Sequence, residues 1–194
     1  MKILNPLLLL LLISTAAIAA PEHSPWPGGV GIVPITGADR PSVTVNGKQA
    51  LVLKRDGAWL AVIGIPLEHD SATPLFATVT RPGTESEQVS IDLRAANYRV
   101  QRLTVASKYV EPSKESMERI FLERKIIDKA LTNWRDAELE EVTLEPPVPG
   151  NRSSSFGSRR IFNDQPRSPH KGMDIAAVSG TPILAPLGGM VSAI

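Results

Sequence analysis

The sequence predicts a mainly β protein made of an N-terminal β-sandwich module, one connecting amphipathic α-helix and a second, β-rich domain. Three observations support this fold class. Residues 26–106 contain short apolar runs separated by turn signals. Residues 112–136 carry apolar residues at the helical period, and residues 156–194 return to short β-prone runs separated by glycine and proline. With 42% hydrophobic residues in 194, the chain can build one sizeable core or two small ones.

Residues 1–19 have the features of a secretory signal peptide. Lys2 precedes a leucine-rich run, and small residues follow with an Ala-x-Ala cleavage pattern at Ala17 and Ala19. The apolar run is too short for a comfortable membrane span, so we expect cleavage after Ala19 and no stable span afterwards. An uncleaved anchor is the alternative. The signal predicts export to the periplasm or the cell wall.

Composition limits the classes of partner and of stabilising bond. The chain has no cysteine, which excludes a lipidated cysteine at the signal junction and a disulfide framework. Removing Lys2 with the signal takes the formal net charge from +1 to 0. Because no overall charge then favours an anionic polymer or lipid, we expect no nucleic-acid partner.

The expected N-terminal module is built from hairpins. The dipeptides Asn46-Gly47 and Asp56-Gly57 each lie between apolar or β-branched runs, which is the strongest short-range hairpin signal. Three later segments continue the pattern: residues 75–80, 88–93 and 98–105. In the last of these the apolar phase slips by one residue, which predicts a bulge or a switch of sheet. Six or seven strands in about eighty residues indicate a small β-sandwich.

A single amphipathic helix is expected in residues 112–136. Ser113 follows Pro112 and is a suitable N-cap. The apolar residues recur near the helical period: Met117, Ile120, Phe121, Ile127, Leu131 and Trp134. We expect this stripe to pack between the two domains. We expect two ion pairs on the outer face of the helix, each between oppositely charged residues four positions apart: Glu115 with Arg119, and Arg124 with Asp128.

Residues 145–155 are expected to form a linker, because proline, glycine and serine break all periodicity there. The second domain, residues 156–194, contains three β-prone segments, residues 173–177, 181–186 and 189–194. The last of them would end at Ile194 with its backbone groups unpaired. We therefore expect the natural protein to continue beyond this residue.

Within the second domain, His170 lies four residues ahead of Asp174, in a chain with three histidines. Pro169 and Gly172 disfavour a helix, and in extended backbone an even spacing places both side chains on one face. Imidazole nitrogen and carboxylate oxygen are both good zinc ligands, but a catalytic zinc needs three protein ligands. The pair is therefore either part of a metal site or two polar residues of an ordinary loop and strand.

Four motifs follow one another around this pair: Phe156-Gly157-x-Arg159, Pro169-His170-x-Gly172-x-Asp174-Ile175-Ala176, Gly180-Thr181-Pro182 and Gly189-Met190-Val191. Together they resemble the opening of the catalytic domain of the lysostaphin-like (LytM-type) zinc metallopeptidases, metallopeptidase family 23. The β-rich segment and the helix upstream are more weakly similar to the N-terminal module that precedes this domain in some secreted members.

The resemblance implies a zinc site. His170 and Asp174 match the family's first two zinc ligands, while the third ligand and the general base lie in a later His-x-His, which would fall beyond the last residue of this sequence. The catalytic domain is thus expected to be truncated here, and this chain inactive. Asn163 is expected to occupy the position of the zinc's water. Arg159 is expected to support a ligand. Arg167 lies in a locally basic segment that either meets substrate carboxylates or is an ordinary solvated loop.

The resemblance also implies a function, an exported zinc metalloendopeptidase that hydrolyses the peptide cross-links of peptidoglycan. Its cofactor is then zinc, and its partners are peptidoglycan peptide stems. One alternative is a non-catalytic family member that activates a cell-wall amidase; such activators have typically lost zinc ligands, and both ligands are present here. Another is a wall-binding β-sandwich module. The remaining histidines, His23 and His69, are expected to be exposed polar residues.

Overall fold

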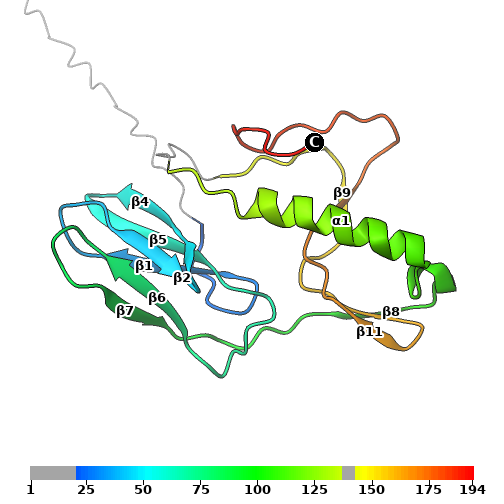
Figure 1. Cartoon of the computed structure of the whole chain (residues 1–194), viewed down its shortest axis with the longest axis horizontal. Coiled ribbons are helices and arrows are strands. Elements are labelled where there is room, and N and C mark those ends of the chain that lie inside the picture. Colours follow the sequence, from blue (N-terminus) through cyan, green and yellow to red (C-terminus); the bar gives the residue numbers. More distant parts are fainter. Residues whose placement is uncertain (1–20, 137–142) are drawn as a thin grey trace, which may run out of the picture.

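The structure, a computed structural model, describes residues 21–136 and 143–194. The predicted signal peptide, residues 1–19, lies outside the described residues. The predicted fold class is confirmed, because the described chain is mostly β, with several sheets and one α-helix. Figure 1 shows the N-terminal sandwich on one side of the molecule, and the helix with the C-terminal strands on the other.

Two antiparallel sheets form the N-terminal sandwich. One sheet has the strand order β1-β5-β4 and the other has the order β3-β2-β6-β7. Neighbouring strands all run antiparallel, as expected of a segment built from hairpins. The strands are β1 Val30–Ile35, β2 Ser42–Val45, β3 Lys48–Gln49, β4 Leu51–Arg55, β5 Ala58–Gly64, β6 Leu75–Thr80 and β7 Glu87–Ile91.

The two predicted hairpin turns join β2 to β3 and β4 to β5. Val45 pairs with Lys48, and Arg55 pairs with Ala58, so each loop contains two residues. All four loop residues have positive φ: 50° at Asn46, 74° at Gly47, 49° at Asp56 and 80° at Gly57. Positive φ at both central positions is characteristic of a type I′ turn, whose twist matches that of the flanking strands.

Alternating residues from both sheets form the core of the sandwich. Val43, Ile63 and Val79 are its largest fully buried side chains. Along β6, Leu75, Ala77 and Val79 are buried, while the residues between them are less so. Each large aliphatic side chain buried in this way stabilises the fold by about 1.5–3 kcal/mol. The module therefore has a core of its own.

Residues 98–105 were predicted to belong to this module, and the structure corrects that prediction. Strand β8, Val100–Leu103, pairs in parallel with β10, Arg159–Phe162. The slipped apolar phase therefore marks a switch to another sheet, which was one of its two interpretations. Val100 and Leu103 stay 49% and 41% exposed, so this strand adds little to any core.

The rest of the C-terminal part consists of short strands. Strand β11, Gln165–Arg167, completes the sheet β11-β10-β8, and strands β9, Asn151–Ser154, and β12, Asp174–Ala176, form a separate pair. Strand β9 lies inside residues 145–155, which were predicted to be a linker. Its polar sequence has no strand pattern, and its backbone is ordered by pairing with β12.

Helix α1, Lys114–Leu131, begins where predicted, and the Oγ of Ser113 caps it by accepting from Ser116 N at 3.3 Å. The predicted packing of its apolar stripe between the domains is wrong, because α1 contains no buried residue. Neither predicted charge pair forms an ion pair within the described residues; Arg119 instead bonds Glu123 at 2.7 Å. Exposed ion pairs add so little to stability that a charged side chain can exchange one neighbouring partner for another. The helix is too polar to cross a membrane, and the described residues contain no other helix that could.

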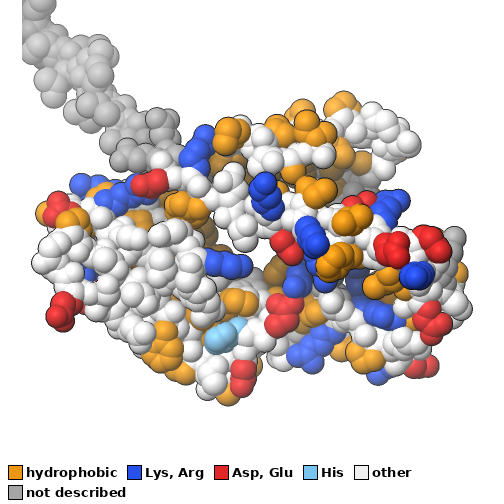
Figure 2. Space-filling model, in the orientation of Figure 1, with side chains coloured by type: hydrophobic (Ala, Val, Ile, Leu, Met, Phe, Trp, Pro, Cys, Tyr) orange, Lys and Arg blue, Asp and Glu red, His pale blue; other side chains and the backbone are white. Residues whose placement is uncertain are grey.

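Residues 177–194 contain no strand, although two strands were predicted there. Their apolar side chains are exposed: Val178, Ile183, Leu184, Met190, Val191 and Ile194. Figure 2 shows hydrophobic side chains gathered over α1 and this segment. Two backbone hydrogen bonds join this segment to residues 145–147, from Glu145 N to Pro186 O at 2.9 Å and from Leu184 N to Pro147 O at 2.8 Å. They do not extend into the continuous ladder that a strand requires.

Candidate functional site

His170 and Asp174 come together beside the short strands of the C-terminal part. The His170 N–H donates to Ser158 O at 2.9 Å, and its carbonyl accepts from Gly157 N at 2.8 Å. Asp174 is the first residue of β12 and lies opposite Ser154 of β9. These two pairings direct both side chains to one place, where His170 Nε2 and Asp174 Oδ1 are 3.2 Å apart.

A backbone carbonyl fixes the orientation of the His170 ring. His170 Nδ1 lies 3.2 Å from Ser155 O. Because a carbonyl oxygen only accepts, this contact is a hydrogen bond in the tautomer that carries its proton on Nδ1, and in that tautomer the Nε2 lone pair on the side of Asp174 can bind a metal ion. The His170 side chain is 12% exposed, whereas that of Asp174 is 52% exposed. The pair therefore opens to solvent on the side of the carboxylate.

The pair fits two ligands of a tetrahedral zinc. Ligand distances of about 2.0–2.1 Å at a tetrahedral angle place two ligand atoms ~3.3 Å apart, close to the 3.2 Å between Nε2 and Oδ1. The Ser155 carbonyl behind Nδ1 is the kind of outer partner that zinc-bound histidines commonly have. Arg160 Nη2 lies 3.8 Å from the other oxygen of Asp174 and faces it with a positive charge.

A third ligand does not join the pair within the described residues, where no group of three or more His, Asp or Glu side chains could hold a metal. The other two histidines lie in the N-terminal module and bond to its backbone. His23 Nδ1 accepts from Ile32 N at 3.0 Å. His69 Nε2 is 3.1 Å from Thr73 O.

The two arginines predicted near the zinc or the substrate have different surroundings. Arg167 Nη2 donates to Val110 O at 3.0 Å, so its guanidinium holds the segment before α1. Arg159 is exposed and lines a pocket of about 310 Å³ that also includes Pro169, the residue before His170. Arg159 is therefore accessible to a substrate beside the pair, whereas Arg167 bonds its own chain.

Asn163, the third of these predicted residues, lies in the β10–β11 turn with φ of 48°. Its Oδ1 accepts from Val105 N at 2.9 Å, and its Nδ2 donates to Val105 O at 3.0 Å. Its amide group therefore fastens the turn to the segment that follows β8. A position of Asn163 at the zinc's water stays a prediction.

Replacing Asn163 by alanine should loosen this connection by about 1–3 kcal/mol, since both polar groups of Val105 lose their partner. Asn163→Asp keeps the acceptor for Val105 N and should cost less. Hydrogen exchange at the Val105 amide measures both effects. An alanine variant with unchanged exchange and raised peptidase activity would contradict this structural role and support a place at the zinc.

The pocket beside His170 depends on Tyr98, a residue that the sequence pattern did not indicate. The Tyr98 hydroxyl donates to Pro27 O at 2.7 Å, and its ring meets Phe156 edge-on with centroids 6.4 Å apart. Burial raises the pKa of Tyr98, which keeps the phenol protonated as a donor. Tyr98 thus joins the N-terminal module to the segment that precedes the His170–Asp174 pair.

An ion pair makes a second connection between the module and this site. Lys171 Nζ lies 2.6 Å from Glu68 Oε1, and the hydrogen bond from Lys171 holds the pKa of the Glu68 carboxyl below its usual value. Both side chains are more than half exposed, so the pair contributes at most about 1 kcal/mol. Its effect is positional, because Lys171 follows His170 directly in sequence.

Comparison with known proteins agrees with this architecture. Residues 23–92 match the N-terminal domain of peptidase family M23. A crystal structure from Pseudomonas aeruginosa, of a protein assigned to peptidase M23, is similar with a TM-score of 0.64 and 28% sequence identity. The similarity covers 84% of this chain and 60% of that chain, so it extends beyond the N-terminal domain. No curated protein matches this chain. Residues 23–92 are thus similar to the N-terminal domain of peptidase family M23, and the chain spans less than two thirds of the length of the similar solved structure.

Proposed function

We propose that this protein is an exported zinc endopeptidase that hydrolyses the peptide cross-links of peptidoglycan. Similarity to the N-terminal domain of peptidase family M23 and to a solved protein assigned to that family supports a peptidase role. The observation that carries the proposal is the 3.2 Å approach of His170 Nε2 to Asp174 Oδ1, which suits two ligands of one zinc ion. The signal-like residues 1–19 support export, and peptidoglycan peptide stems are then the substrate.

In this proposal the residues of the chain hold and orient the reacting groups. The Ser155 carbonyl keeps the proton of His170 on Nδ1, which leaves Nε2 as the ligand. Asp174 adds a negatively charged ligand whose second oxygen faces Arg160. When bound, zinc polarises a peptide carbonyl and lowers the pKa of water to about 7. The proposed reaction also requires a third zinc ligand and a general base, in addition to these residues.

The pocket beside His170 gives the substrate a place to bind next to this site. Its walls include Tyr98, Arg159 and Pro169, from both the module side and the catalytic side. Arg159 is exposed there and can pair with a carboxylate of a stem peptide. The module would then help to position the peptide near the scissile bond.

Zinc content read beside hydrolysis tests the proposal. The full-length protein should retain zinc, and a chelator should remove both the zinc and the cleavage of defined muropeptides. Adding zinc back should restore cleavage. Full cleavage by metal-free protein would refute the proposal. A zinc-free protein that cleaves nothing but stimulates a cell-wall amidase would support the alternative activator role.

A further inference from the structure

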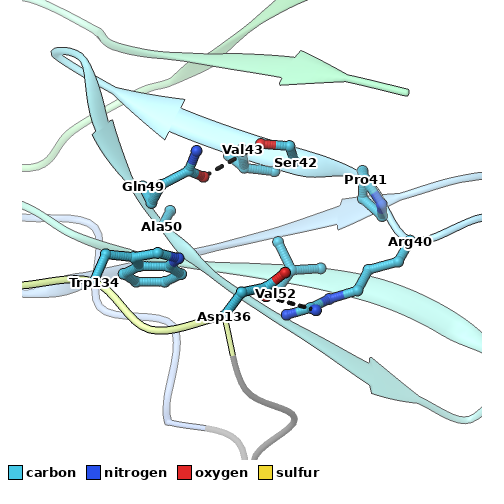
Figure 3. Close-up of a pocket in the computed structure, with 9 residues that line it drawn as sticks. All are labelled: Arg40, Pro41, Ser42, Val43, Gln49, Ala50, Val52, Trp134 and Asp136. Atoms are coloured by element: carbon cyan, nitrogen blue, oxygen red, sulfur yellow. Dashed lines mark hydrogen bonds and ion pairs between the residues drawn. The ribbon is translucent and has the colours of Figure 1, made fainter. Parts of the chain in front are cut away.

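A second pocket lies on the sandwich and shares no residue with the His170–Asp174 site. It has a volume of about 360 Å³, at the small end of the range for ligand sites. One side is formed by the start of β2 and by strands β3 and β4, and the other by Trp134 and Asp136, which follow α1 (Figure 3). Segments about ninety residues apart in sequence therefore build one concave surface.

The apolar part of this pocket offers a flat aromatic surface. Val43 and Val52 are buried behind it. Trp134 is 46% exposed, and Figure 3 shows its indole at one end of the pocket, near Ala50. An indole pairs a large apolar face with one N–H donor. A ligand with a flat apolar face and polar edges would use both properties.

Polar side chains surround the indole and keep unused hydrogen-bonding capacity. Ser42 Oγ donates to Gln49 Oε1 at 3.2 Å, which orients the Gln49 amide. The Gln49 amide nitrogen and the Trp134 indole nitrogen have no bonding partner within the described residues. An amide, a hydroxyl and an indole N–H can therefore meet several ligand hydroxyl or acetamido groups at once.

The pairing of charges in this pocket favours a neutral ligand over an ionic one. Its two charged side chains, Arg40 and Asp136, bond each other at 2.8 Å, as the dashed line in Figure 3 marks. A phosphate or a carboxylate needs a cation that is not already neutralised, and a cationic ligand needs a free carboxylate. The expected ligand is neutral, rich in hydrogen-bonding groups, and apolar on one face.

We propose that this pocket binds a neutral saccharide, with a sugar ring against Trp134 and its polar groups on Gln49 and on the Arg40–Asp136 pair. The ring carbons and hydrogens of a pyranose make one apolar face, and its substituents point outward as donors and acceptors. Because the pocket shares no residue with the His170–Asp174 site, saccharide binding there does not require peptidase activity. Only the identification of the saccharide with the glycan strands of the wall rests on the proposed function.

Fluorine NMR of the full-length protein labelled with 5-fluorotryptophan, titrated with tri-N-acetylchitotriose, tests the proposal. The Trp134 resonance, assigned by its loss in Trp134→Phe, should shift saturably. Trp134→Ala should weaken binding at least about tenfold. Gln49→Ala should weaken binding less. Phe76→Ala, which removes an aromatic side chain 52% exposed on β6, is the matched control and should bind like the unaltered protein.

Three outcomes would overturn the saccharide site. One is a Trp134 resonance that does not move at millimolar trisaccharide. Another is equal affinity in Trp134→Ala and the unaltered protein. The third is a shift caused by a sugar-free stem pentapeptide and not by the trisaccharide, which would make this a peptide site. His170→Ala should bind the trisaccharide normally, so a failed peptidase proposal and a failed saccharide proposal give different results.

Discussion

Replacing His170 by alanine in the full-length protein should abolish both zinc retention and lysis of purified peptidoglycan, and Asp174→Ala should do the same. Each substitution removes one of two ligand atoms that lie 3.2 Å apart. Losing a residue that merely orients a ligand costs about 10- to 100-fold in affinity or activity. Losing the ligand itself should lower zinc affinity and activity by more than about 100-fold. Zinc quantification and a peptidoglycan gel overlay measure the two effects separately.

His23→Ala is the matched control for the histidine substitution. His23 accepts a hydrogen bond from Ile32 N in the N-terminal module and takes no part in the His170–Asp174 pair. Its replacement should leave zinc content and lysis unchanged. If His170→Ala retained its zinc, the pair would be an ordinary hydrogen-bonded contact. Unchanged lysis after either ligand substitution would remove the assignment of zinc chemistry to this site.

The sandwich could be predicted because short stretches of neighbouring residues specify its hairpins. Asn46-Gly47 and Asp56-Gly57 specify type I′ turns by their tolerance of positive φ, and a two-residue loop then sets the register of both hairpins. The partner of β8 could not be predicted. Its sequence indicates extended backbone, but parallel pairing with β10 joins segments almost sixty residues apart and leaves no local pattern.

Helix α1 shows a second limit of local patterns. Its spacing of apolar residues correctly predicts a helix, capped at Ser113. The same spacing also led to the expectation of a buried stripe. An amphipathic pattern indicates which face of a helix can be buried, but another part of the protein must cover that face. The described residues do not bury any residue of α1. The two strands predicted after residue 177 do not form, because this segment shares only isolated backbone hydrogen bonds with residues 145–147.

The candidate site was predictable only in its sequence-adjacent part. His170 and Asp174 lie four residues apart, so a short motif contains both. Ser155 and Arg160, which contact them, precede the motif and have no fixed spacing that signals these contacts. Tyr98 lies still further away, in a connecting segment, and it reaches the site through Gly157. Sequence therefore indicates the donor atoms, and folding supplies what orients them.

The contact between Tyr98 and the segment that carries His170 is most sensitive to substitution at Gly157. Its φ is +80°, and a Cβ added there would lie 2.0 Å from Tyr98 Cε1. The Tyr98 ring cannot easily move aside, because its hydroxyl bonds Pro27 O and its edge meets Phe156. Gly157 N also donates to His170 O. A side chain at this position would therefore disturb both the contact with the module and the backbone that carries His170.

Gly157→Ala should destabilise this region by about 2–5 kcal/mol, combining roughly 1–2 kcal/mol for positive φ with 1–3 kcal/mol for overpacking. Hydrogen exchange at the His170 amide, which bonds Ser158 O, measures the local loss. Zinc affinity should fall with it, because the His170 backbone is released.

Gly57→Ala separates the two contributions. Gly57 has the same φ of +80°, but a Cβ there would meet nothing within 4 Å. Its substitution should therefore show only the backbone cost, measured at the β4–β5 hairpin. Tyr98→Ala in the Gly157→Ala background should recover the overpacking part, giving a non-additive double-mutant cycle. If Gly157→Ala cost no more than Gly57→Ala, then contact with Tyr98 would not be what ties the N-terminal module to the segment carrying His170.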